Sequence, residues 1–70
     1  MNKTITKNGA FKGWLVSRGI RQKEIADLLD IGIQSVNNKL NGKSEFTLPQ
    51  IRTICEHYNI SADIFVDNTL

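Results

Sequence analysis

Apolar residues recur along most of the chain with the spacing of an α-helix. In the first such segment Phe11, Trp14 and Leu15 stand at i, i+3 and i+4, which predicts a helix from about 8 to 17. Gly19 follows this segment, and glycine is common just past the C-terminus of a helix. We therefore expect a first helix that buries a largely aromatic face.

Two shorter helices follow with a brief turn between them. The second is predicted over 22–29, where apolar residues form a broad stripe, and the third from 33 to about 40 or 41. Residues 30–32 form the turn, and the Asn-Gly pair at 41–42 is a strong helix breaker. The chain thus contains a closely spaced pair of short helices.

The fourth predicted helix has the clearest start signal. Thr47 is a good N-cap, Gln50 stands where it can complete a capping box, and Pro49 lies in the first turn. Apolar residues then recur at i, i+3, i+4 and i+7 until Asn59, which ends the helix. A last short turn is expected over 61–65.

No segment alternates in the manner of a β-strand, so the expected fold class is all-α, a compact bundle of five short helices. The expected organisation is a flexible N-terminal arm over 1–7, one domain over 8–66 and a C-terminal tail over 67–70.

Composition limits the function classes. A single cysteine excludes an intrachain disulfide and the cysteine-based zinc motifs. No apolar run reaches the ~20 residues that span a bilayer, and no run of signal-peptide length follows the N-terminal lysines. The sequence holds no glycine-rich phosphate loop and no catalytic constellation. We expect a cytoplasmic protein that is not an enzyme and has no metal, cofactor, membrane or small-molecule partner.

The net charge of +2 is unevenly distributed. Residues 1–43 contain eight Lys or Arg and three acids, a net charge of +5, whereas residues 44–70 contain one Arg and four acids, a net charge of −3. The basic part would meet phosphate while the acidic part faces away. Chance variation on a solvated surface is the alternative explanation.

The helix pair over 22–41 is suited to close crossing. Ala26 gives its first helix a small side chain at the crossing, Ile31 can fill the gap at the turn, and Val36 anchors its second helix to the core. The helix that begins at 33 is then expected to protrude from the surface of the domain. A B-DNA major groove about 12 Å wide admits one such helix.

Exposed side chains on this protruding helix suit the edges of bases. An amide donates and accepts together, as the adenine edge requires, and an apolar group matches the thymine methyl. Asparagine is a poor helix former, so two adjacent asparagines need a reason, although fraying before the Asn-Gly breaker is the alternative. The candidate base-reading residues are Ile33, Gln34, Ser35, Asn37 and Asn38.

The segment from about 11 to 65 resembles the lambda-repressor-like helix-turn-helix family, which includes Cro and the phage repressors. The resemblance rests on GIRQKEIADLLDIG, then SVNNKLNGK, then IRTICEHYNISADIF. It implies a sequence-specific regulator of transcription, Cro-like or of the phage-repressor type, that binds double-stranded DNA. The alternative is a protein-interaction module of the same fold, an antirepressor or repressor partner, that does not read DNA itself.

The resemblance also implies roles for individual residues. Ile33, Gln34 and Asn38 match the positions that read bases, with Ser35 and Asn37 close by. Other matched positions, and neighbouring cations, would bind DNA phosphates. This phosphate-binding set is Gln22, Arg21, Lys39, Asn41, Gly42 and Lys43.

Some positions depart from the family pattern. Asp30 replaces the usual turn glycine, but Asp tolerates left-handed backbone better than most residues. Arg21 stands where a capping residue is common, so the second helix is expected to be weakly capped. Lys39 stands where an apolar residue is common, with Leu40 taking over the packing. Leu15 and Leu40 replace an ion pair of many relatives and are expected to share one core.

The remaining candidate residues have structural interpretations. Trp14 is expected in the core, Cys55 is expected to be an inert small hydrophobe, and His57 has no second ligand at metal-binding spacing. Lys3 and Lys7 have two interpretations, an arm along the DNA or an ordinary basic terminus.

One protruding helix contacts few base pairs, so we expect a homodimer on a near-palindromic operator. The C-terminal part carries more apolar side chains than a small core buries from one chain. The predicted dimer interface is Phe65, Val66 and Leu70. A monomer whose tail folds back is the alternative.

Overall fold

The computed structural model describes residues 9–65, which contain four α-helices, one short 3-10 helix and no strand. The elements are α1 (Gly9–Arg18), α2 (Gln22–Leu29), α3 (Ile33–Leu40), α4 (Leu48–Tyr58) and η1 (Ala62–Phe65). The all-α class and the positions of the four helices are as predicted. The fifth expected helix is a single 3-10 turn, because four residues are too few to build an α-helical ladder.

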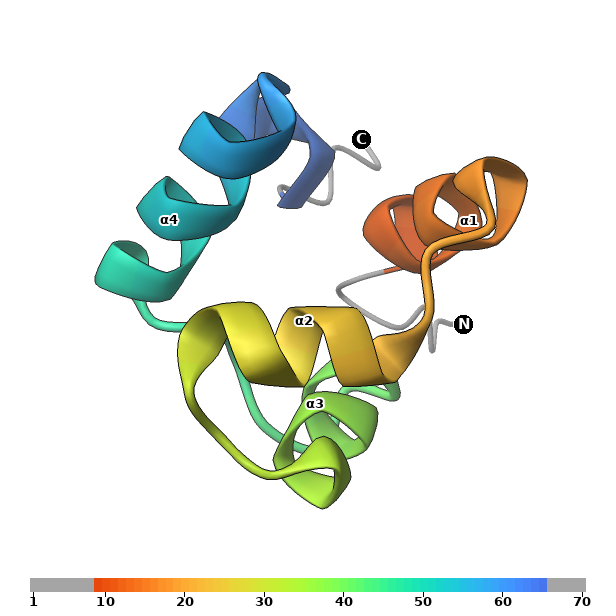
Figure 1. Cartoon of the computed structure of the whole chain (residues 1–70), viewed down its shortest axis with the longest axis vertical. Helices are drawn as coiled ribbons and strands as arrows, with labels where there is room; N and C mark the ends of the chain where they lie inside the picture. Colours follow the sequence, from red (N-terminus) through yellow and green to blue (C-terminus); the bar gives the residue numbers. More distant parts are fainter. Residues whose placement is uncertain (1–8, 66–70) are drawn as a thin grey trace, which may run out of the picture.

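The helices divide the molecule into two ends (Figure 1). Helix α2 crosses the middle and contacts both α3 and α4. Helix α3 lies at one end of the long axis, whereas α4 and η1 lie toward the other end, and η1 also contacts α1. The predicted arm over 1–7 and the tail over 67–70 lie outside the described residues.

All four α-helices end in the same way. Each is followed, directly or in α3 after Asn41, by a residue with left-handed backbone. The next residue donates its N–H to the carbonyl oxygen five positions earlier, at 2.9–3.1 Å. This is the Schellman motif, which satisfies carbonyl groups that a helix C-terminus leaves without partners. The left-handed residues are Gly19, Asp30, Gly42 and Asn59. Asp30 therefore adopts the conformation expected of it, with φ 59° and ψ 46°.

The residue after the left-handed position differs at α3. After α1, α2 and α4 it is an isoleucine (Ile20, Ile31, Ile60), half-buried against the core. A hydrophobic contact of this kind commonly accompanies the motif. After α3 it is Lys43, which is exposed. The chain after α3 therefore carries an exposed cation at the position where the chain after the other three helices carries a half-buried isoleucine.

The helix starts also follow the sequence signals. Thr47 Oγ1 accepts from the Gln50 backbone N–H at 3.3 Å, and Gln50 Oε1 accepts from the Thr47 N–H at 3.0 Å, so the predicted capping box of α4 is confirmed. Arg21 has no acceptor with which to cap α2. Its backbone N–H instead donates to the Glu24 carboxylate at 3.4 Å, which leaves α2 with half of a capping box.

The core lies where α1, α2, α3 and α4 meet. Its buried residues are Phe11, Leu15, Ile25, Ala26, Val36, Leu40, Phe46 and Ile54. Leu29 and Ile51 are partly buried and pack at its edge. Leu40 is 1% exposed, so it and not Lys39 packs inward, and it shares this cluster with Leu15 as expected.

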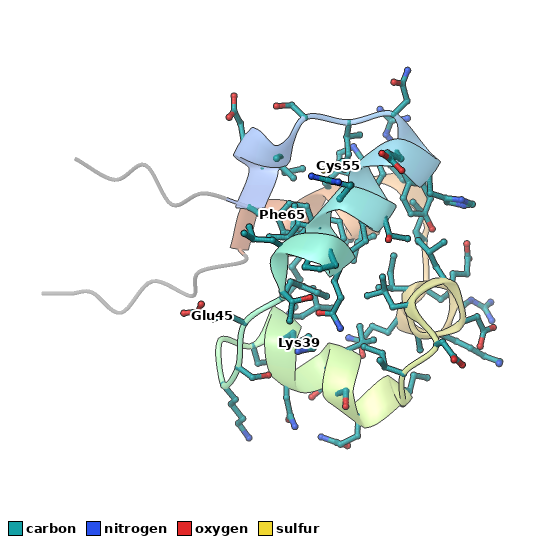
Figure 2. The ribbon with its side chains drawn as sticks, turned by 90° about the vertical axis from the view of Figure 1, so that its left-hand side faces the viewer. Lys39, Glu45, Cys55 and Phe65 are labelled. Atoms are coloured by element: carbon teal, nitrogen blue, oxygen red, sulfur yellow. The ribbon has the colours of Figure 1, made fainter. Side chains whose placement is uncertain are left out.

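An aromatic cluster, which the helical periodicity of the sequence does not predict, closes the core on the side of η1. The Phe65 ring lies 4.5 Å from Phe11 and 5.6 Å from Phe46, and Phe46 stands edge-on to Phe11 at 5.8 Å. Phe46, which lies between α3 and α4, is 7% exposed. The Phe65 ring, expected at a dimer interface, is half-buried in this intrachain cluster (Figure 2). The other two predicted interface residues, Val66 and Leu70, lie outside the described residues.

Candidate nucleic-acid interface

The two faces of α3 have opposite character. Val36 and Leu40 are fully buried, whereas Gln34 and Ser35 are exposed and Ile33 is 50% exposed. Helix α3 itself lies at the end of the molecule away from α4 (Figure 1). An apolar group, a hydroxyl and the Gln34 amide are therefore exposed together on the side of α3 that faces away from the core.

Two amides on this face are joined to each other. Gln34 Nε2 donates to Asn38 Oδ1 at 3.1 Å, one helical turn apart. The pair keeps the Gln34 oxygen as an acceptor and the Asn38 NH2 group as a donor. Gln34 and Asn38, both predicted base-reading residues, thus form one unit with mixed hydrogen-bonding capacity.

The third predicted amide, Asn37, lies on the flank of α3 and is half-buried, as Asn38 is, but its hydrogen bonds differ. Its NH2 group donates to Gln22 Oε1 at 3.4 Å, and its oxygen accepts from the Asn41 NH2 group at 3.1 Å. Asn41 Oδ1 in turn accepts from the Lys12 ammonium group at 3.1 Å. We call these four residues (Lys12, Asn41, Asn37, Gln22) the amide chain; it links α1, the end of α3 and the start of α2.

The predicted phosphate-binding residues fall into different settings. Arg21 is exposed at the start of α2, and Lys43 is exposed just beyond α3. Gly42, which directly precedes Lys43, has φ 81°. Lys39 is half-buried on the other flank of α3. Its ammonium donates to the Glu45 carbonyl oxygen at 3.0 Å and lies 5.8 Å from the Phe46 ring (Figure 2). Lys39 therefore secures the loop that carries Phe46 into the core.

Sequence reasoning missed Lys12, which the structure brings to α3. Lys12 and Asn41 are 29 positions apart, and their contact depends on how α1 and α3 approach each other. The available signal was the surplus of cations in residues 1–43, which does not single out one lysine.

The aromatic and cysteine side chains that could have stacked on bases or reacted are packed within the protein. The Trp14 ring stacks on Phe11 at 6.1 Å and meets Tyr58 edge-on at 5.4 Å. Burial, and secondarily Glu56, raises the pKa of the Cys55 thiol, so the reactive thiolate is disfavoured. Burial, and secondarily Glu24, raises the pKa of Tyr58. Within residues 9–65 no three His, Cys, Asp or Glu side chains gather where a metal ion would bind.

No helix in the described part of the chain has the length and apolar character needed to cross a membrane.

The fold and this surface define a small helical domain in which one short helix is displayed against a second. Residues 12–70 match the family model of the BetR domain, and the chain belongs to that family. The BetR domain is a helix-turn-helix-type domain, which confirms the class of fold expected from the sequence.

Comparison with solved structures gives the same fold. The chain is similar to the crystal structure of a transcriptional regulator from Listeria innocua, with a TM-score of 0.79 and 16% sequence identity. The match covers 94% of this chain and 64% of that one, so the chain spans less than two thirds of the regulator's length. A search of curated proteins gave no significant match.

Proposed function

We propose that this protein is a sequence-specific, double-stranded DNA-binding regulator of transcription. In this proposal α2 and α3 form the helix-turn-helix, and α3 enters the major groove. The observation that carries the proposal is the Gln34–Asn38 pair at the tip of the molecule. The family, and the similarity to a solved transcriptional regulator, support the same class of function.

The chemistry of the pair explains why bases are the expected ligand. Gln34 keeps an acceptor oxygen, and Asn38 keeps a donor NH2 group. Adenine presents an acceptor at N7 and a donor at N6 in the major groove, so a side-chain pair with one of each matches it. Ile33 beside the pair is half-exposed and suits the methyl group of a neighbouring thymine.

We further propose that the domain is of the lambda-repressor-like type, because its sequence resembles that family. We also propose that two copies of the protein bind a near-palindromic operator. A single module of this size buries about 600–1,000 Å² of protein surface on DNA, which limits its affinity among genomic competitors. Two modules on half-sites about 34 Å apart would combine their affinities. Because Phe65 packs on Phe11, the variant that tests the interface is Leu70→Glu and not a Phe65 substitution.

Selection of random DNA duplexes with the purified protein tests the function. We expect a short preferred sequence in two inverted halves, with centres one helical turn apart. A preferred sequence without inverted symmetry would refute the two-fold dimer and leave the reading function standing. Enrichment of no sequence over several rounds would refute the function and favour a protein-interaction module.

A further inference from the structure

The amide chain has a direction, and Lys12 sets it. An ammonium group donates hydrogen bonds and cannot accept them, so the Asn41 oxygen must face Lys12. The Asn41 NH2 group therefore faces Asn37, whose oxygen accepts from it. The Asn37 NH2 group then faces the Gln22 oxygen. A lysine on α1 thus decides which way the amide at the start of α2 points.

This direction leaves the amide chain with a surplus of donors. Each of its amide oxygens already accepts one internal bond. Lys12 keeps two N–H donors, and Gln22 keeps both hydrogens of its NH2 group. Phosphate oxygens accept hydrogen bonds and do not donate them. The amide chain therefore matches the DNA backbone, whereas the Gln34–Asn38 pair offers both a donor and an acceptor and matches bases.

The position of Lys12 agrees with this chemistry. Its side chain is exposed, and its ammonium is held 3.1 Å from Asn41, two residues before the exposed Lys43. Lys12 therefore brings a cation from α1 to the end of α3. A side chain that is already held in place loses less conformational freedom when a ligand binds.

We propose that Lys12 is a phosphate-binding residue of the DNA interface and that Asn37 and Asn41 are positioning residues that orient it and Gln22. This inference rests on the proposed function. It assigns Asn37 a role different from the base-reading role expected from the sequence, because both ends of its amide are engaged within the protein.

Binding of Lys12→Met to the selected duplex and to a shuffled duplex, measured as a function of salt, tests the assignment. Loss of one phosphate contact should weaken binding to both duplexes alike, roughly fivefold at 0.15 M salt, and lower the slope of log K against log salt by about one. Lys12→Arg should retain the slope. Arg52→Met, which removes the same charge from an exposed site on α4, is the matched control and should leave the slope unchanged.

The positioning role has its own readout. Asn37→Ala should weaken binding to both duplexes by the same factor, so the ratio of the two affinities stays constant. In an Asn41→Ala background, Lys12→Met should lower the DNA affinity by a smaller factor than it does in the wild type. The reason is that Asn41 no longer holds the Lys12 ammonium in place.

Three results would overturn the inference. If Lys12→Met leaves the salt slope unchanged while the wild type binds its selected duplex, the proposal is wrong and the proposed function stands. If Asn37→Ala lowers the affinity ratio, Asn37 reads bases and is not a positioning residue. If the wild type binds no duplex, both the proposed function and this inference are wrong.

Discussion

Replacing Leu40 by alanine should lower the free energy of unfolding by about 2–5 kcal/mol. Leu40 is 1% exposed and lies in the cluster that joins α1 to α3. Truncation removes buried methyl groups and leaves a cavity that the surrounding helices fill incompletely. Small domains unfold at a total cost of only about 5–15 kcal/mol, so the loss is a large fraction of the stability. Urea denaturation followed by circular dichroism measures it.

Leu48→Ala is the matched control, since the same atoms are removed from a side chain that is 81% exposed. A surface substitution of this kind should change the stability by no more than about 0.5 kcal/mol. Equal losses for Leu40→Ala and Leu48→Ala would contradict the assignment of Leu40 to the core.

Gln34→Ala and Asn38→Ala should each weaken binding to the selected duplex by about 1–3 kcal/mol, which is roughly 5- to 150-fold. Binding to shuffled DNA should change little, because the lost contacts are to base edges. Fluorescence anisotropy on the two duplexes gives both affinities. Since the two side chains are hydrogen-bonded to each other, the double variant should lose less binding free energy than the sum of the losses of the two single variants.

Lys43→Ala provides the contrast. Its exposed side chain follows α3 at a position where the other helices carry a half-buried isoleucine. Removing it should weaken binding to every sequence alike and reduce the salt slope by about one. If Gln34→Ala and Lys43→Ala had the same effect on selected and shuffled DNA, the division between base reading and phosphate binding would be wrong.

The helix positions were predictable because their signals are local. The Thr47 capping box fixes the start of α4, and left-handed residues such as Asp30 and Gly42 end helices by bonds that reach only five positions back. A pattern of residue types along the sequence records these interactions directly. The inward face of α3 was predictable for the same reason, since Val36 and Leu40 stand one helical turn apart.

Contacts between distant segments were not predictable in this way. Phe46 follows a polar loop and no helical period marks it as buried, yet its ring packs edge-on against both Phe11 and Phe65. Lys12 likewise reaches Asn41 through the approach of two helices that are not consecutive. Side-chain chemistry identified the amides of α3, but only their hydrogen bonds separate Asn37 from the Gln34–Asn38 pair.

The central claim is that the Gln34–Asn38 face of α3 reads base edges, and the side-chain NH2 resonances of these two residues report on it directly. A nitrogen–proton correlation spectrum should be recorded as the labelled protein is titrated with the selected duplex and, separately, with the shuffled duplex. We expect the NH2 signals of Gln34 and Asn38 to shift strongly with the selected duplex and weakly with the shuffled one, while backbone signals of α4 remain in place. Unchanged Gln34 and Asn38 signals at saturation with the selected duplex, with the shifts gathered on α4 or η1, would contradict the claim.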